Sequence, residues 1–266
     1  MSTKKKRVAL PAARAVAAPG SAAAAVAELR RLGSKATRDG MARYGLPSDA
    51  AFGVPVGTLR QLAKRLGQNQ ELALELWATA HYEARLLAIF VADPEQVTPA
   101  LMDRWCRDFD NWAVCDTACF HLFDRVPHAL GKVAAWARRQ PEFEKRAAFA
   151  LLASAALHDK GGDDELYAVC FPLIEGAATD ERNFIKKAVS WALKGLGGRG
   201  PELHAAALDL AQRLARAEDA TARWIGKDAL RDLARPATLK RVAKAAEKRR
   251  TAAGTKKKTV KKKRPG

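Results

Sequence analysis

The feature that most constrains the fold is the helical spacing of apolar residues through almost the whole chain. Segments such as 59–66 (LRQLAKRL) and 71–77 (ELALELW) place Ala and Leu at i, i+3 and i+4 among Glu, Lys, Arg and Gln. These residue types form helices well, and this period is that of an amphipathic helix. No segment alternates apolar and β-branched residues with polar ones for long enough to form a strand. We therefore expect an all-α protein built from short helices.

Four segments share one pattern, in which polar residues and a base lead into an apolar helix. They are HYEARLLAIFVA (81–92), EFEKRAAFALLA (142–153), NFIKKAVSWALK (183–194) and RWIGKDALRDLA (223–234). Each follows another amphipathic segment, and helix pairs that recur about every 40 residues are typical of HEAT-type solenoids. Such pairs stack because neither helix can bury its apolar face alone. The pattern predicts a HEAT-like α-solenoid, curved and with a basic concave face.

One acid interrupts the row of bases. When the repeats are aligned by eye, Arg85, Arg146, Lys187 and Lys227 occupy equivalent places, and Asp116 takes the same place in the remaining repeat. The steps between them are 31, 30, 41 and 40 residues. Arg and Lys on a concave surface are suited to contact DNA phosphates and fix the register of a duplex. An acid there repels phosphates, so we expect Asp116 to have a different role.

The net charge of +18 is concentrated at the two ends of the chain. Residues 1–14 carry five bases and no acid, and residues 240–266 carry thirteen bases and one acid. The body from 15 to 239 has 29 bases and 28 acids. We therefore expect a disordered basic arm over 1–20, a solenoid domain over 21–239 and a mostly disordered basic tail over 240–266. Either tail would attract phosphates without sequence preference.

Several functional classes find no support in the composition. The four cysteines form no C-x-x-C pair and are expected to be buried thiols in a reducing compartment. The five histidines lack ligand-like spacing, so we expect no metal site and no cofactor. No apolar run is long enough to cross a membrane, and prolines interrupt the Ala-rich N-terminal stretch that could otherwise imitate a signal peptide. We expect a monomer in the cytoplasm, in a bacterial cytosol or nucleoid.

Two tryptophans share a helix face with the charged row. Trp112 lies four residues before Asp116, and Trp191 lies four after Lys187. Indole faces attract cations, and a carboxylate in a cleft can stabilise developing positive charge. Breaking an N-glycosidic bond creates such charge on the sugar, and alkylation at purine N3 or N7 already makes the base cationic. The simpler alternative is that Asp116 pairs with a nearby Arg or caps a backbone amide.

Five stretches resemble the AlkD-type DNA alkylation repair proteins, in the order found in that family. They are MARYGLPSDAAFGVPVGTLRQLAK (41–64), LELWATAHYEARLLAIFVAD (74–93), NWAVCDTAC (111–119), FEKRAAFALLA (143–153) and NFIKKAVSWALK (183–194). The resemblance covers about 25–235 and implies a HEAT-like solenoid that releases N3- and N7-alkylpurines. It also implies that Asp116 is the catalytic carboxylate, that Trp112 and Trp191 form aromatic walls, and that Arg146 lies near the phosphates of the damaged strand.

Two positions depart from that family pattern and leave the rate and the lesion range open. Asn111 stands where a second aromatic residue is common, and Ala113 stands where an acid is common. We therefore retain three hypotheses. The first is a monofunctional glycosylase acting on alkylated bases in double-stranded DNA. The second is a non-catalytic solenoid that binds damaged or structured DNA, and the third is a protein-binding scaffold. The first requires the Asp116 carboxylate to lie beside the indoles and not in a buried ion pair away from them.

Overall fold

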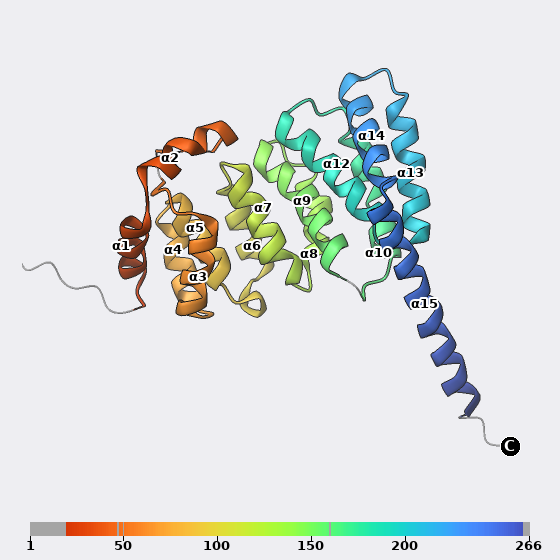
Figure 1. Cartoon of the computed structure of the whole chain (residues 1–266), viewed down its shortest axis with the longest axis horizontal. Helices are drawn as coiled ribbons and strands as arrows, with labels where there is room; N and C mark the ends of the chain where they lie inside the picture. Colours follow the sequence, from red (N-terminus) through yellow and green to blue (C-terminus); the bar gives the residue numbers. More distant parts are fainter. Residues whose placement is uncertain (1–19, 47, 50, 160, 263–266) are drawn as a thin grey trace, which may run out of the picture.

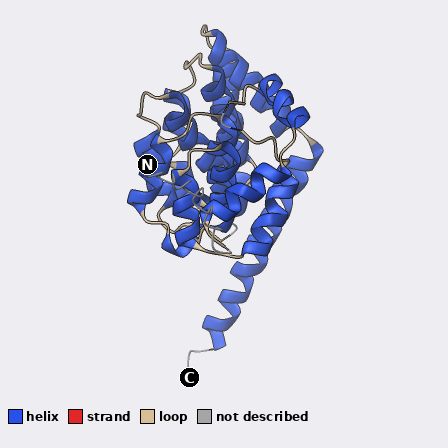
Figure 2. Ribbon diagram, turned by 90° about the vertical axis from the view of Figure 1, so that its left-hand side faces the viewer, coloured by secondary structure: helices blue, strands red, loops and turns tan. Residues whose placement is uncertain are grey.

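The computed structural model describes residues 20–46, 48–49, 51–159 and 161–262. Within these residues the regular structure is helical throughout and no strand occurs (Figures 1 and 2). The elements are α1 (Ala22–Leu32), α2 (Lys35–Met41), η1 (Ala42–Tyr44), α3 (Val56–Leu66), α4 (Gln70–Ala78), α5 (Tyr82–Val91), η2 (Pro94–Gln96), α6 (Pro99–Arg107), α7 (Trp112–His121), η3 (Phe123–Arg125), α8 (Ala129–Trp136), α9 (Glu142–His158), α10 (Glu165–Ala168), α11 (Phe171–Gly176), α12 (Asn183–Gly197), α13 (Pro201–Ala215), α14 (Ala220–Leu233) and α15 (Pro236–Lys262). The predicted all-α class is confirmed.

The helices stack in chain order, from α1 at one end to α14 at the other (Figure 1). The second helices of the pairs form a continuous row in which α5, α7, α9, α12 and α14 each pack against the next. The first helices, among them α4, α8 and α13, pack against their own partners on one side of that row. This is the arrangement of a solenoid, in which each repeat buries its apolar face against its neighbours.

Local sequence explains where many of the helices begin. Polar side chains accept a hydrogen bond from the backbone N–H three residues later and so satisfy an otherwise free donor. These N-caps are Ser21, Ser34, Asn69, Thr98, Asn111 and Asp219. The cap at Asn111 fixes the first turn of α7. This helix carries both Trp112 and Asp116.

Three tryptophans on the first helices of their pairs lie in the core. Trp77 and Trp105 stack with ring centroids 3.9 Å apart and nearly parallel planes, and Trp136 is fully buried. The four cysteines are free and buried, as predicted. At Gly226 of α14, an added Cβ would lie 2.3 Å from the backbone nitrogen of Ala215, so only glycine permits this close approach to α13.

The predicted N-terminal arm lies outside the described residues except for Gly20. The basic tail expected over 240–266 begins within α15, which runs as one helix from Pro236 to Lys262, and the disorder expected of this tail stays a prediction. Ala, Lys and Arg are strong helix formers, and Val242 and Arg249 attach the first half of α15 to the body. The second half projects away from the body (Figure 2). No helix in the described part of the chain is long and apolar enough to cross a membrane.

A buried carboxylate fixes the segment that precedes α3. Glu83 of α5 is fully buried and accepts hydrogen bonds from the backbone N–H groups of Phe52, Gly53 and Val54, at 2.8, 2.7 and 3.0 Å. Gly53 has a φ of +79°, and a Cβ there would lie 2.2 Å from the Ser34 carbonyl oxygen. The carbonyl of Gly53 in turn accepts from the N–H of Ser34, which caps α2. Glu83 therefore holds α2, and through it η1, against the solenoid.

Replacing Glu83 with Ala should lower the free energy of unfolding by about 3 kcal/mol, because three backbone donors lose a charged acceptor. Urea denaturation followed by circular dichroism measures the change. Glu75→Ala is the matched control, since Glu75 is exposed on the neighbouring helix α4 and should change stability by less than about 0.5 kcal/mol. Equal denaturation midpoints for the two variants would contradict this account.

Candidate active site

A cleft of about 570 Å³ lies where α7, α9 and α12 begin, beneath η1. Its lining combines one carboxylate, bases and aromatic rings. The lining residues are Arg43, Tyr44, Gly45, Trp112, Asp116, Arg146, Asn183, Phe184 and Lys187. The structure therefore brings together four of the residues predicted from the sequence, namely Trp112, Asp116, Arg146 and Lys187.

Asp116 and Arg146 form a bidentate ion pair between α7 and α9. Arg146 Nε donates to one carboxylate oxygen at 2.8 Å and Nη2 donates to the other at 2.6 Å. Its Nη1 donates to the carbonyl oxygen of Phe184 on α12, and the guanidinium lies 5.8 Å from the centroid of the Phe184 ring. The Asp116 side chain is still 20% exposed, whereas that of Arg146 is 8% exposed. The ion pair expected under the simpler alternative exists, but it lies in the wall of the cleft, which Asp116 lines.

Burial and the ion pair act on the Asp116 carboxyl group in opposite directions. Burial raises its pKa, because removal from water disfavours the charged form, and the hydrogen bonds and positive charge of Arg146 oppose this rise. The net direction is upward. Burial by itself would lower the pKa of Arg146, but the hydrogen bonds to Asp116 outweigh it and raise that pKa above its usual value, so the guanidinium stays charged. A carboxylate with a raised pKa in a cleft is typical of a functional group.

Trp112 is held by its edge, and its ring lines the cleft. The indole Nε1–H donates to the carbonyl oxygen of Tyr44 at 2.8 Å. Tyr44 ends η1, and the next residue, Gly45, has a φ of +65°, which turns the chain back toward the body. Tyr44 itself is 65% exposed, and the Arg43 guanidinium lies 6.0 Å from its ring centroid. The segment 43–45 therefore borders the cleft on the side of Trp112.

Trp191 lies in an adjoining hollow and does not line the cleft of Asp116. It is one helix turn beyond Lys187 on α12, and its ring centroid is 6.4 Å from that of Phe120 on α7. Phe120 itself lies one turn beyond Asp116. The hollow of about 290 Å³ is lined in part by Trp191, Lys194 and Arg241. Trp112 and Trp191, predicted as two walls of one cleft, therefore line two adjoining hollows, and of the two only Trp112 borders the Asp116 carboxylate.

The four aligned bases have different surroundings. Lys187 is exposed within the cleft, and Lys227 is exposed on α14 outside it. The Arg85 side chain is only 12% exposed and makes its contacts within the protein. It donates to Asp108 and Asp110 and lies over the ring of Trp77. Arg146 is likewise occupied by Asp116 and Phe184. The structure thus leaves Lys187 and Lys227, but not Arg85 and Arg146, free to contact phosphates.

Sequence reasoning did not assign Arg43, Tyr44, Asn183 or Phe184 to the site. The first two belong to η1, which lies outside the helix repeats, so the alignment of repeats gave them no position. The signal that could have identified Arg43 and Tyr44 is the Arg-Tyr-Gly triplet at 43–45. Among the described residues no cluster of His, Cys, Asp and Glu has the arrangement of a metal site.

Comparison with known proteins assigns the family. The sequence model of the family described as "DNA alkylation repair enzyme" matches residues 25–233. The chain belongs to this family. The match covers the cleft and ends before α15 begins. A search of the curated proteins finds no match for this family member.

One solved structure shares the fold of this DNA alkylation repair family member. It is described as "a new family of proteins related to the HEAT-like repeat DNA glycosylases with affinity for branched DNA structures". The TM-score is 0.67 at 20% sequence identity, over 79% of this chain and 94% of that one. The predicted HEAT-like solenoid is thereby confirmed. A designed armadillo repeat protein in complex with a (KR)4 peptide gives a TM-score of 0.36 at 12% identity, over 72% of this chain and 80% of that one.

The ion pair should couple α7 to α9 energetically. Asp116→Asn or Arg146→Met alone leaves a buried polar partner uncompensated and should cost about 3 kcal/mol of stability. The double variant should cost less than the sum, with a coupling energy of about 2 kcal/mol in urea denaturation. The same cycle at the exposed pair of Lys35 and Asp39 should give a coupling close to zero. Equal couplings at the two sites would refute the structural role of the buried pair.

Proposed function

We propose that this protein is a monofunctional DNA glycosylase that hydrolyses the N-glycosidic bond of cationic N3- and N7-alkylpurines in double-stranded DNA. The observation that carries the proposal is the Asp116 carboxylate, which Arg146 holds from one side and which still faces the cleft beside the Trp112 ring. Family membership supports repair of alkylated DNA as the setting.

The geometry fits a reaction that develops positive charge on the deoxyribose. A carboxylate has about four acceptor positions, and Arg146 occupies one on each oxygen. The remaining positions can face the sugar or a water molecule. Because Arg146 fixes the carboxylate before substrate binds, little reorganisation is needed as the oxocarbenium forms. Asp116 then stabilises that charge and orients, or takes a proton from, the water that attacks the sugar. The products are a free base and an abasic site.

The aromatic residues and bases around Asp116 have complementary roles. Trp112 offers a ring face to the cationic lesion, an attraction of about 0.5–2 kcal/mol. Trp191 contacts the nucleotide that extends into the adjoining hollow. Lys187 and Arg43 contact phosphates at the cleft, and Lys227 contacts a phosphate farther along. The N-termini of α7, α9 and α12 also meet at the cleft, and their dipoles favour negative phosphate oxygens there.

The two departures from the family pattern do not remove any of these parts. Asn111 is buried, with only 2% of its surface exposed. Its side-chain oxygen caps α7 by accepting a hydrogen bond from the Val114 N–H at 3.0 Å. Ala113 is half-buried and packs against the core. We expect these residues to alter the range of lesions that fit rather than the position of Asp116.

A non-catalytic DNA-binding solenoid is the second candidate, and one observation favours it. Arg146 neutralises Asp116, so the pair has no net charge and attracts a cation less strongly than a free carboxylate does. The structurally similar protein described above is characterised by affinity for branched DNA. In this alternative the ion pair would only join α7 to α9, and bases would not be released.

Asp116→Asn distinguishes the two candidates. Release of 7-methylguanine from methylated duplex DNA, measured by chromatography, should fall by about 10²–10³-fold, because a preorganised charge is lost from the transition state. Binding of the same DNA should be retained. Asp103→Asn is the matched control, since Asp103 is also multiply paired but lies on α6 in the other layer of helices. No release by the wild-type protein, or unchanged release by Asp116→Asn, would favour the second candidate.

The pH dependence of single-turnover release provides a separate test. The reaction needs Asp116 ionised, so the rate should increase as the pH rises through its pKa and level off above it. Because that pKa is raised, the midpoint should lie above the unperturbed value of 3.8. Arg146→Lys weakens the bidentate hydrogen bonds and should move the midpoint to higher pH. Arg182→Lys, which alters a similar pair with Asp180 outside the cleft, should leave it unchanged. A midpoint at or below 3.8 would exclude Asp116 as the titrating group.

A further inference from the structure

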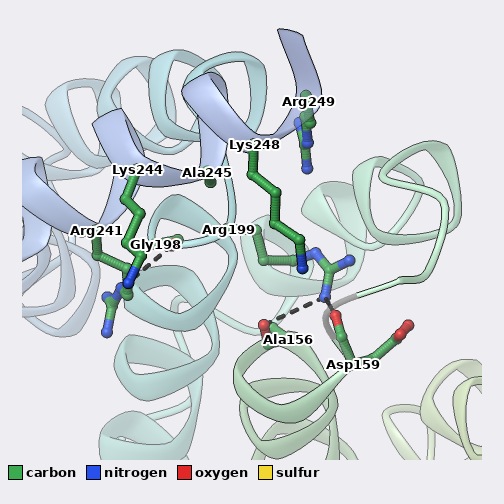
Figure 3. A pocket seen from close by; sticks show the side chains of 9 residues that line it. All are labelled: Ala156, Asp159, Gly198, Arg199, Arg241, Lys244, Ala245, Lys248 and Arg249. Atoms are coloured by element: carbon green, nitrogen blue, oxygen red, sulfur yellow. Dashed lines mark hydrogen bonds between the residues drawn. The ribbon is translucent and has the colours of Figure 1, made fainter. Parts of the chain in front are cut away.

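A second concave site lies at the opposite end of α12 from the Asp116 cleft. It is a groove of about 440 Å³ between α15 and the C-terminal ends of α9 and α12. We call it the α15 groove. It is lined by Ala156, Asp159, Gly198, Arg199, Arg241, Lys244, Ala245, Lys248 and Arg249 (Figure 3). It shares no lining residue with the cleft.

Specific contacts fix α15 over this groove. Arg249 donates to Asp164 at 2.5 Å and to Glu202 at 3.3 Å, and Arg241 donates to the Gly198 carbonyl oxygen at 3.2 Å. In the first two turns of the same helix, Thr238 and Val242 are buried. The first half of α15 is therefore a positioned wall of the groove.

Some of the groove's bases have structural partners. Arg199 donates to the carbonyl oxygens of Ala156 and Asp159 (Figure 3). It also donates to the carboxylate of Asp164. These contacts satisfy the free carbonyl groups at the end of α9, which would otherwise repel an anion. Asp159 itself accepts from Tyr167 and from the backbone of Gly162. The acids of the groove are thus committed to contacts within the protein.

Two lysines have no acidic partner among the described residues. Lys244 and Lys248 are exposed, and both extend from α15 toward the ends of the underlying helices (Figure 3). Arg241 makes only its bond to the Gly198 carbonyl and also lines the adjoining hollow that contains Trp191. Three neighbouring cations therefore have free hydrogen-bonding capacity toward one concave surface.

The spacing of these cations favours an extended polyanion over a single small anion. Residues 241, 244 and 248 lie at i, i+3 and i+7, so they share a face and span about 10 Å of the helix. Phosphates of one DNA strand follow one another every 3.4 Å along the axis of the duplex. About three of them therefore fit this span when the duplex runs alongside α15. A single phosphate ion would engage only part of the row.

The groove is also in line with the cleft. Pocket linings follow α12 from Asn183, Phe184 and Lys187 at its start, through Trp191 and Lys194, to Gly198 just beyond its end. Because α12 has 15 residues, the two sites are about 20 Å apart, or about six base pairs of duplex. A single DNA molecule can therefore reach both.

We propose that the α15 groove is a second DNA-backbone site, in which Arg241, Lys244 and Lys248 bind phosphates about six base pairs from the nucleotide in the cleft. The sequence predicted a free basic tail that attracts phosphates diffusely. In this proposal, three side chains on a positioned helix make the contact instead. The site rests on the proposed function only in taking DNA as the ligand, and it does not depend on base release. The three cations lie on α15, beyond the segment 25–233 that the family model matches.

The test compares two double variants of the full chain with equal loss of charge. Lys244→Ala with Lys248→Ala removes groove cations, whereas Lys240→Ala with Arg250→Ala removes exposed bases of α15 outside the groove. Binding to a duplex of about 24 base pairs with a central 7-methylguanine is measured by fluorescence anisotropy over a range of salt concentrations. The groove variant should make the slope of log K against log salt less negative by about 1.8, because two phosphate contacts are lost. The control should leave the slope nearly unchanged.

Duplex length provides the second arm. A duplex that extends only about four base pairs to each side of the lesion cannot reach the groove, so the groove variant and the wild type should bind it with equal slopes. Equal slopes for both double variants on the long duplex, or the same loss on the short one, would overturn the α15 groove as a DNA site. Failure of the wild type to bind the long duplex would instead refute DNA binding as a whole. Retained binding without base release would refute only the glycosylase proposal.

Discussion

The candidate site depends on one ion pair that joins three successive repeats. Arg146 of α9 holds both oxygens of Asp116 on α7 and also donates to the Phe184 carbonyl at the start of α12. In a solenoid each repeat contacts only its neighbours, so relative positions along the row must be set by contacts of this kind. A guanidinium is suited to this task because it is planar, stays charged and presents several donors in fixed directions. The carboxylate is therefore placed by the assembly of repeats rather than by α7 alone.

The ion pair shows that the aligned charged residues do not all have the same role. The aligned bases looked equivalent in sequence, but Arg146 is buried and Arg85 is half-buried, both among partners, whereas Lys187 and Lys227 are exposed. The two arginines are structural elements that orient the surface, and the exposed lysines are the residues available to DNA. Arg and Lys behave in this way generally, because guanidinium is less strongly hydrated than ammonium and is more easily buried with a partner.

The C-terminal segment shows where a compositional argument was incomplete. Thirteen bases in residues 240–266 favour disorder through self-repulsion. Yet Ala, Lys and Arg also have high helix propensity, and the first half of α15 gains buried contacts at Val242 together with ion pairs from Arg249 to Asp164 and Glu202. Those acids are far away in sequence, so no local pattern could reveal that they compensate the charge. The groove beneath α15 follows from the same contacts.

The sequence by itself determined the helical class, the order of the repeats, the buried tryptophans and cysteines, and the face that carries Trp112 and Asp116, because each depends on periodicity or on side-chain polarity within one helix. Only the tertiary structure decided which base pairs with Asp116, that Trp191 lines the adjoining hollow and not the Asp116 cleft, and that η1 borders the cleft with Tyr44. These features depend on the rotation and separation of neighbouring helices. Those are set by packing at positions such as Gly226 and by the loop that Glu83 holds, and one-dimensional spacing does not record them.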